Sequence, residues 1–251
     1  MQFEFNGKVV LVTGAASGLG RATARVFAQH GAALCLIDIN ENGLREVQTE
    51  IEQMGRDCLV CCTDISAKVN CEATVTAAIA RFGRLDVLCN VAGIIKLAHT
   101  VDVTAADWER IVGVNLSGPF FLSQAAIPHL LKSEGNIINV ASSAAFVGEA
   151  YLVPYATTKA GLVHMTKSMA MEFMRQPIRI NAVAPGGMMT AMGSTISPPE
   201  GMDFELVQRF TGIRGVSHPE EVANLMLYLA SDNAKFVHGA CLSIDGGITA
   251  G

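Results

Sequence analysis

Charged side chains are scarce in this chain of 251 residues, since Asp, Glu, Lys and Arg make up only 16%, against roughly 25% in an ordinary soluble domain. The 18 basic residues are outnumbered by 23 acidic ones, which gives a formal net charge of −5. This balance disfavours a protein that binds the phosphate backbone of nucleic acids. Half of the residues are apolar, which excludes a disordered chain. A large buried core is therefore expected, enlarged by contacts between subunits.

The sequence also lacks the marks of secretion and of metal binding. The N-terminus has no basic segment followed by an apolar one and a small-residue cleavage site, so we expect a cytoplasmic protein. The seven cysteines are an odd number without the paired Cys and His spacing of a zinc site, so reduced thiols and no metal are expected. The pattern leaves the role of Cys58, Cys61 and Cys62 open.

Two stretches without formal charge, 111–131 and 180–199, approach the length of a membrane span. Polar residues and two prolines interrupt the first, and glycines and prolines break the second. We therefore interpret the first stretch as a buried interface helix and the second as a loop.

Short apolar runs alternate with longer helical patterns along the chain, which is typical of repeated βαβ units and a parallel sheet. The runs show little polar alternation, as strands need when both faces of a sheet are covered. No linker-like or repetitive tract divides the chain. The sequence therefore predicts one doubly wound α/β domain over residues 1–251, with a seven-stranded parallel sheet and helices on both faces. Strands are expected at 9–12, 33–37, 58–62, 87–89, 136–140, 179–183 and 241–244, and helices from about Ser17, Glu41, Ala67, Ala105, Pro154 and Glu220, with a short one at 204–210.

A glycine-rich turn at residues 13–20 follows the first predicted strand and leads into a helix. This order aims backbone N–H groups at a pyrophosphate. Gly14 would permit the sharp turn, Gly18 a close approach of the cofactor, and Gly20 the packing of helix on strand. Taken alone, the motif also fits an ordinary connection between strand and helix. A P-loop is not supported, because no Lys followed by Ser or Thr comes after the last glycine.

Asp38 ends the second predicted strand, 18 residues after Gly20. That spacing is near the one expected for an acid that binds the adenosine ribose. A carboxylate accepts hydrogen bonds from the 2′- and 3′-hydroxyls but repels a 2′-phosphate, and no Arg or Lys occupies position 17 or 39 to offset that repulsion. The sequence therefore predicts NAD, in preference to NADP.

Tyr155 and Lys159 follow Pro154 and are four residues apart, so they share one face of a predicted helix. A phenol is a poor base near neutral pH, and a neighbouring ammonium favours its ionised form. The pair is a candidate acid–base unit, although this spacing is also common on helix surfaces. The strand at 136–140 leads to Ser142 and Ser143, which places hydroxyls where open α/β sheets bind their ligands.

Together, these motifs resemble those of the short-chain dehydrogenase/reductase family in its single-domain form, over essentially the whole chain. The resemblance implies a Rossmann fold and an NAD(P)-dependent oxidoreductase. The chain departs from the family at Val91, where the family commonly has Asn. The shared motifs are, in order, 13–20, Asn90-Val91-Ala92-Gly93, Asn115, Tyr155 with Lys159, Pro185-Gly186 and Asp245-Gly246-Gly247.

The resemblance also implies roles for single residues. Ser142 would polarise the substrate carbonyl, and Tyr155 would move the proton. Lys159 would lower the pKa of Tyr155 and hold the nicotinamide ribose, while Asn115 would anchor a water in a proton relay. Ser142 is favoured over Ser143 because it precedes Tyr155 by the family's usual 13 residues. The expected cofactor-binding residues are Gly14, Ser17, Gly18, Leu19, Gly20, Asp38, Asp64, Ile65, Asn90, Ala92, Gly93, Tyr155, Lys159, Pro185, Gly186, Met188 and Thr190.

The sequence thus favours an NAD-dependent enzyme that interconverts a secondary alcohol and a ketone. Residues 187–215 are expected to form a lid, rich in glycine and methionine, that brings apolar walls to the substrate. Lys96 and Arg209 are the nearby basic residues, and neither is placed in the sequence to clamp an anion. An uncharged lipophilic substrate, cyclic in preference to linear, is expected. The apolar walls would come from Met188, Met192, Met202 and Phe204 on one side and from Ile94, Ile95, Phe146 and Val153 on the other.

Other functions remain open. The rival from another class is a catalytically silent dinucleotide-binding regulator or scaffold, against which the joint presence of Ser142, Tyr155, Lys159 and Asn115 argues. Within the enzyme class, a cyclic diol dehydrogenase or a reductase of activated double bonds is compatible with the same motifs.

A homodimer or homotetramer is expected from the excess of apolar helix surface. The stretches 111–131 and 158–173 carry this surface, the second with Leu162, Met165 and Met169 along one side. The family resemblance implies that these two helices pair across a two-fold axis.

Overall fold

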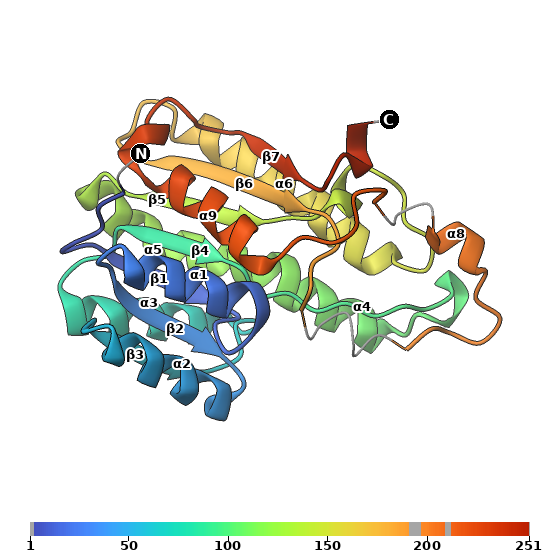
Figure 1. Ribbon diagram of the computed structural model, residues 1–251, viewed down its shortest axis with the longest axis horizontal. Helices are drawn as coiled ribbons and strands as arrows, with labels where there is room; N and C mark the ends of the chain where they lie inside the picture. Colours follow the sequence, from blue (N-terminus) through green and yellow to red (C-terminus); the bar gives the residue numbers. More distant parts are fainter. Residues whose placement is uncertain (1–2, 191–196, 209–211, 251) are drawn as a thin grey trace.

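A seven-stranded parallel sheet forms the centre of the molecule, in the strand order β3-β2-β1-β4-β5-β6-β7 (Figure 1). The computed structural model describes residues 3–190, 197–208 and 212–250. Because the strand order runs outward in both directions from β1 and β4, the loops after these two strands separate at their carboxyl ends, where open α/β sheets bind ligands. The strands are β1 Val9–Thr13, β2 Ala33–Asp38, β3 Cys58–Cys62, β4 Val87–Asn90, β5 Asn136–Val140, β6 Arg179–Pro185 and β7 Cys241–Ile244.

Helices cover both faces of the sheet. α1 packs against α9 on one face, and α3 packs against α5 on the other, with α6 beside it (Figure 1). Shorter helical turns, among them η3 Ser143–Ala145, join these elements. The helices are α1 Gly18–Gln29, α2 Glu41–Gln53, α3 Lys68–Phe82, α4 Ala105–Val112, α5 Gly118–Ser133, α6 Val153–Glu172, α8 Phe204–Gln208 and α9 Pro219–Ala230.

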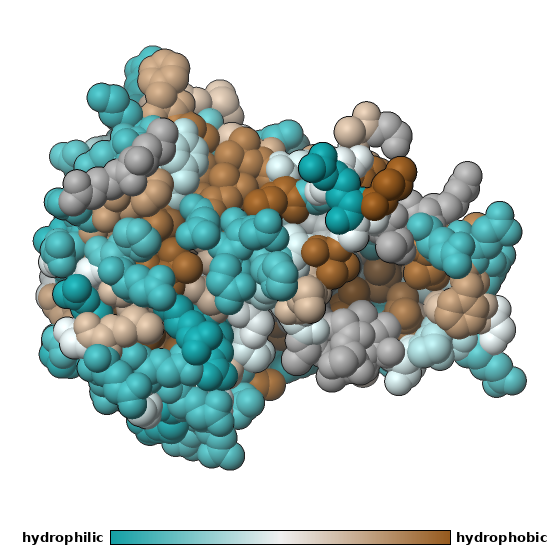
Figure 2. Space-filling view, viewed as in Figure 1, coloured by the Kyte–Doolittle hydropathy of each residue, from teal (hydrophilic) through white to brown (hydrophobic). Residues whose placement is uncertain are grey.

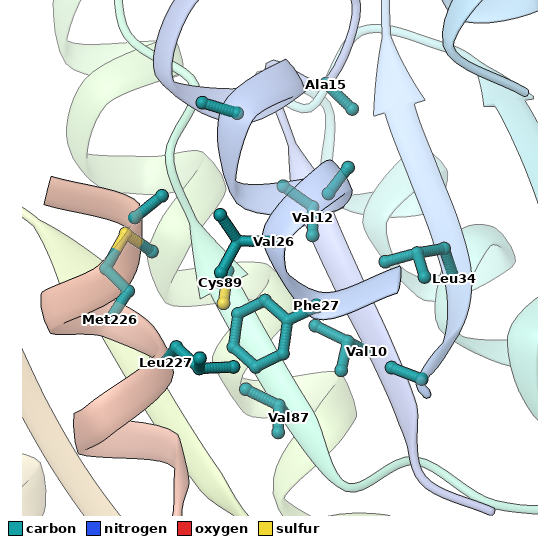
Figure 3. Packing of buried hydrophobic residues seen from close by; sticks show 14 of the residues in the cluster. Val10, Val12, Ala15, Val26, Phe27, Leu34, Val87, Cys89, Met226 and Leu227 are labelled. Carbon is teal, nitrogen blue, oxygen red and sulfur yellow. The ribbon is translucent and has the colours of Figure 1, made fainter. Parts of the chain in front are cut away.

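The strand β1 shows how an uninterrupted apolar run serves two cores. Successive side chains point to opposite faces, so Val10 and Val12 enter the core under α1, α2 and α9, whereas Val9 and Leu11 enter the core under α3, α5 and α6. The Phe27 ring of α1 is fully buried in the first core and faces Val10, Val87 and Leu227 (Figure 3). This double covering is why the strand has no polar alternation.

The predicted fold class is confirmed, and the strands agree with the predicted ones to within two residues at each end. The uncharged stretch 111–131 is helical as expected, and a π-helical segment at Gly113–Ser117 joins α4 to α5 within it. By length and composition alone, the whole run Ala105–Ser133 could cross a membrane. In the fold, α5 packs against α3 and places Leu122, Ala126 and Leu130 in the core.

The prediction that Leu162, Met165 and Met169 of α6 face another subunit is wrong. Leu162 is 1% exposed and Met169 8% exposed, and Met169 and Met165 belong to the core between α6 and the chain's own sheet. The reason is that α6 needs its apolar stripe to cover β5 and β6. The large apolar side chains that α5 and α6 leave exposed are instead those of Phe120, Val153 and Met171.

The described parts of the segment 187–217 leave the sheet after β6, at 187–190, and lead back to α9, at 212–217. A parallel bridge between Met188 and Ser217 closes the base of this excursion, with the Ser217 amide donating to the Gly187 carbonyl at 3.0 Å. The helix α8 lies on its far part, at the right of Figure 1. The predicted lid therefore has two fixed ends next to the carboxyl end of β6.

Candidate functional site

A cavity of about 280 Å³ opens at the carboxyl ends of the central strands. Loops after β1, β2, β4, β5 and β6 line it, together with the first turns of α6. In Figure 2, hydrophobic side chains gather in a recess on this side of the molecule, whereas the surface over α1 and α2 is mainly hydrophilic. The cavity brings together every sequence-predicted site residue except Asn90 and Asn115.

The glycine turn after β1 is as tight as the sequence predicts. Gly14 has φ of 67°, in the left-handed region that suits glycine. A Cβ at Gly20 would lie 2.0 Å from the Gly14 carbonyl oxygen, so no side chain fits where α1 meets the turn. The Thr13 hydroxyl accepts hydrogen bonds from the amides of Val91 and Ala92, both at 2.9 Å. These bonds tie the glycine turn to the loop after β4.

Asp38 closes β2 and lines the cavity near Ile39. Its carboxylate accepts from the Ala16 amide at 3.1 Å and from the Asn40 amide at 3.0 Å. The carboxylate is thus held on the glycine turn by backbone bonds, with lone pairs left for a ligand.

Arg110 is a lining residue that the sequence reasoning missed. It comes from α4 and pairs with Asp64, with 2.5 Å between Nη1 and Oδ2. Burial by itself would raise the pKa of Asp64, but hydrogen bonds from Ser66 and Arg110 outweigh burial and lower the pKa below its ordinary value. No local motif marks Arg110, because the fold alone brings α4 to the loop after β3.

Ser142, Tyr155 and Lys159 meet at the opposite end of the cavity. Ser142 lies just after β5, and its Oγ accepts from the Ala144 amide at 3.2 Å. The Lys159 ammonium lies 5.6 Å from the centre of the Tyr155 ring and donates to the Val140 carbonyl at 2.7 Å. Pro154 in the first turn of α6 sets the start of this helix, which points both side chains at the end of β5.

The pKa of Tyr155 differs from the expectation. Burial raises the pKa of Tyr155, the Ser142 hydrogen bond opposes this, and the nearby charge of Glu149 raises it further. Burial also lowers the pKa of Lys159 to about 8. The expected lowering of the Tyr155 pKa by Lys159 does not appear in this structure, because desolvation of the phenol outweighs every favourable contact.

Asn115 and Asn90 lie behind the cavity wall. The Asn115 amide oxygen accepts from the Ile94 amide at 2.8 Å, and its nitrogen donates to the Ile94 carbonyl at 2.9 Å. Asn115 sits in the π-helical segment, a geometry often found at functional sites. Asn90 donates to the Asn139 side chain at 2.8 Å. Both residues thus hold the loops that form the wall.

The substrate end of the cavity has apolar and neutral lining. Met188 and Ile94 line the cavity, while Phe146, Val153 and Phe204 are 46%, 42% and 61% exposed. Lys96 is engaged by Asp107 at 2.7 Å. The expected contributions of Met192 and Arg209 lie outside the described residues.

The far part of the 187–217 excursion is fastened to two loops beside the cavity. The Tyr151 hydroxyl accepts from the Asp203 amide at 3.0 Å, and His99 Nε2 bonds the Glu200 carbonyl at 2.9 Å. The His99 and Tyr151 rings meet edge to face, with centres 5.1 Å apart. Tyr151 keeps this position with φ of 65°, a conformation that non-glycine residues rarely adopt.

Comparison with known proteins places the whole chain in one family. A family model described as enoyl-(acyl carrier protein) reductase matches residues 14–249. The chain is 37% identical over 246 residues to a 3-oxoacyl-(acyl-carrier-protein) reductase of Thermotoga maritima, covering 98% of this chain and 99% of the relative. It is 38% identical over 246 residues to 2,5-dichloro-2,5-cyclohexadiene-1,4-diol dehydrogenase of Sphingobium indicum, covering 98% and 97%. Meso-2,3-butanediol dehydrogenase of Serratia marcescens is 36% identical over 247 residues, covering 98% and 96%.

Solved structures support the same family assignment. A 3-ketoacyl-(acyl-carrier-protein) reductase from Brucella melitensis, complexed with NADH, superposes with a TM-score of 0.89 at 31% identity and covers 98% of this chain and 100% of its own. A short chain dehydrogenase from Mycobacterium paratuberculosis, bound to NAD, has a TM-score of 0.92 at 25% identity and covers 99% and 100%. The chain therefore belongs to the short-chain dehydrogenase/reductase family of oxidoreductases.

Proposed function

We propose that the protein is an NAD-dependent enzyme that interconverts a secondary alcohol and a ketone. The observation that carries this proposal is the meeting of Ser142, Tyr155 and Lys159 in the same cavity as the glycine turn and Asp38. The first group can bind an alcohol oxygen and move its proton, and the second can hold a dinucleotide. A fold by itself would not decide the function.

The residues present fit a dinucleotide. The amides of the glycine turn at the N-terminus of α1 suit a pyrophosphate, and Gly14, Gly18 and Gly20 of this turn line the cavity. The Asp38 carboxylate can accept the hydroxyls of the adenosine ribose. When bound, NAD supplies a nicotinamide ring that accepts the hydride.

In alcohol oxidation, Ser142 donates a hydrogen bond to the substrate oxygen and Tyr155 takes the hydroxyl proton. Lys159 holds the end of β5 through the Val140 carbonyl, and its ammonium lies 5.6 Å from the centre of the Tyr155 ring. In ketone reduction, Tyr155 returns the proton to the oxygen. Asn115 keeps the Ile94 backbone in place beside this cluster.

Preference for NAD over NADP is part of the proposal. The basic side chains that line the cavity are engaged, since Arg110 pairs with Asp64 and Lys159 donates to the Val140 carbonyl. A 2′-phosphate beside Asp38 would therefore meet an uncompensated negative charge.

An uncharged, lipophilic and cyclic substrate is the second part of the proposal. The apolar lining near Met188 and Ile94 and the ion pair that occupies Lys96 support it. The relative from Sphingobium indicum is named for a cyclic diol, which keeps a cyclic diol as the second candidate substrate. The protein is further proposed to act in the cytoplasm, as one domain in which 187–215 serves as a lid.

A homodimer or homotetramer is the third part, supported by the exposed Phe120 and Met171 on α5 and α6. Light scattering at micromolar concentration should give a mass of two or four chains. A monomer would contradict this part of the proposal.

The experiment that tests the activity is a panel of cyclic, aromatic and steroidal alcohols with NAD, followed by NADH absorbance. Turnover that is lost in Tyr155→Phe would support the proposed reaction. A protein that binds NADH, as measured by fluorescence, but oxidises no alcohol and reduces no ketone would instead be the silent dinucleotide-binding regulator.

A further inference from the structure

The segment 197–208 is fastened by a clasp, which consists of the side chains of His99 and Tyr151 and the backbone of Glu200 and Asp203. The Tyr151 hydroxyl accepts from the Asp203 amide at 3.0 Å. His99 Nε2 donates to the Glu200 carbonyl at 2.9 Å, since a carbonyl can only accept. The proposed mechanism uses none of these groups, so the clasp is a built feature beside the site that has no role in the proton transfer.

Tyr151 is the centre of the clasp. Its φ of 65° is one that non-glycine residues rarely adopt, and such conformations persist only where the surrounding contacts fix them. The hydroxyl binds Asp203, the ring meets the His99 ring edge to face with centres 5.1 Å apart, and the carbonyl accepts from the Ala98 amide at 3.0 Å. One strained residue therefore joins the loop after β4, the connection into α6 and the segment 197–208.

The clasp lies beyond the substrate end of the cavity. Ile94 and Ser142 line the cavity, and each lies at the start of a connection that leads to the clasp, one to Ala98 and the other to Tyr151. The Ala98–Tyr151 hydrogen bond joins these two connections. Over the part of the chain that the structure describes, neither Ala98 nor Tyr151 lines the cavity. The cavity therefore ends before this junction, and a ligand that reaches further has to part the two connections.

We propose that His99 and Tyr151 determine substrate specificity, because the clasp limits the length of the substrate. The inference rests on the proposed function and names its substrate class, a compact uncharged alcohol or ketone without a long chain on the ring. A longer substrate binds only where the clasp opens, and opening costs the hydrogen bonds to Glu200 and Asp203 together with the ring contact.

The first test compares cyclohexanol with 4-pentylcyclohexanol, using NAD and the full chain. A pocket with room for the pentyl chain would improve binding by about fourfold for each buried methylene. The wild type should show the opposite, a kcat/KM for cyclohexanol about tenfold or more above that for the longer alcohol, because the chain does not fit a closed end.

Two variants open the clasp and keep its rings. Tyr151→Phe removes the hydroxyl that accepts from Asp203, and His99→Phe removes the donor to Glu200. Since a neutral hydrogen bond contributes about fivefold to an equilibrium, each variant should raise kcat/KM for 4-pentylcyclohexanol about fivefold relative to cyclohexanol. The kcat for cyclohexanol should stay within about twofold, because neither residue takes part in the proton transfer. Tyr228→Phe is the matched control, since it removes a phenol hydroxyl from α9 and should leave the ratio unchanged.

A second readout does not depend on activity. A glutamyl endopeptidase cleaves after Glu200 and Glu205, which are both exposed, when the segment 197–208 detaches. Cleavage at these two positions, measured by mass spectrometry, should be about fivefold faster in Tyr151→Phe and in His99→Phe than in the wild type, because proteolysis follows the population of the open form. Tyr228→Phe should be cleaved at the wild-type rate.

The inference is overturned if the wild type oxidises the longer alcohol as well as cyclohexanol, or if both clasp variants keep the wild-type ratio of the two alcohols. Unchanged cleavage in both variants overturns it too, since the clasp would then not hold the segment. If cyclohexanol is oxidised and the ratio does not respond, only the role of the clasp fails. If no alcohol of the wider panel is oxidised, the proposed function fails and the inference fails with it, even where the cleavage rates respond.

Discussion

The choice between NAD and NADP can be reduced to one carboxylate, that of Asp38. In the wild type, Asp38 Oδ2 accepts from the Ala16 amide at 3.1 Å and Oδ1 accepts from the Asn40 amide at 3.0 Å. Replacing Asp38 with Asn removes the negative charge and keeps one acceptor oxygen, so one of these two hydrogen bonds can remain. Asp38→Ala would lose both hydrogen bonds together with the charge and would separate the effects less well.

The magnitude follows from the position of the charge. A unit charge of a 2′-phosphate about 5 Å from the carboxylate costs 332/(20 × 5), or roughly 3 kcal/mol, at an effective dielectric of about 20. Among the described residues, the basic side chains that line the cavity do not offset this cost, because Arg110 pairs with Asp64 and Lys159 donates to the Val140 carbonyl. The ratio of kcat/KM for NAD to that for NADP should therefore fall by about 10² or more in Asp38→Asn.

Initial rates with one alcohol and each cofactor measure this ratio. The matched control is Glu41→Gln, which removes an exposed carboxylate three residues further on and should change the ratio by less than about twofold. Higher salt should narrow the wild-type gap, since ions screen the repulsion. The reasoning is refuted if NADP serves the wild type as well as NAD, or if Asp38→Asn leaves the ratio unchanged.

Three further outcomes test the site and the core. Tyr155→Phe should lower kcat by roughly 10² or more and leave NADH binding nearly intact, because only the proton carrier is lost. Stopped-flow kinetics measures the turnover, and fluorescence titration measures NADH binding. Retained turnover would disprove the role assigned to Tyr155. Burial lowers the pKa of Lys159 from 10.5 to about 8. Below pH 8, carrying this charge in the folded protein therefore lowers the free energy of unfolding. This loss disappears as the pH rises to about 10.5. Urea unfolding should therefore show the wild type gaining about 3 kcal/mol over Lys159→Met between pH 7 and 10.5, and a pH-independent difference would contradict the burial of the ammonium. Phe27→Ala should lower the free energy of unfolding by about 3–5 kcal/mol. Phe236→Ala, at a fully exposed position, should change the free energy of unfolding by less than about 0.5 kcal/mol. Equal effects of the two substitutions would show that the core is misassigned.

Local patterns determined the fold class and most of the cavity lining. The strand Val9–Thr13 is largely apolar because both of its faces are covered. Such a run can be recognised in the sequence without any tertiary information. The glycine turn is equally local, since the clash of a Cβ at Gly20 involves a residue only six positions away. The pairing of Tyr155 with Lys159 follows from helix periodicity alone.

Only the tertiary structure decided which face a helix turns inward and which distant charges meet. The apolar stripe with Leu162 and Met169 could cover a partner subunit or the chain's own sheet. Because α6 lies on the sheet, this stripe packs in the chain's own core. Arg110 meets Asp64 because α4 and the loop after β3 converge at the carboxyl ends of the strands. The pKa of Tyr155 depends on that convergence too, since desolvation is set by every surrounding element and no residue pattern in the sequence records it.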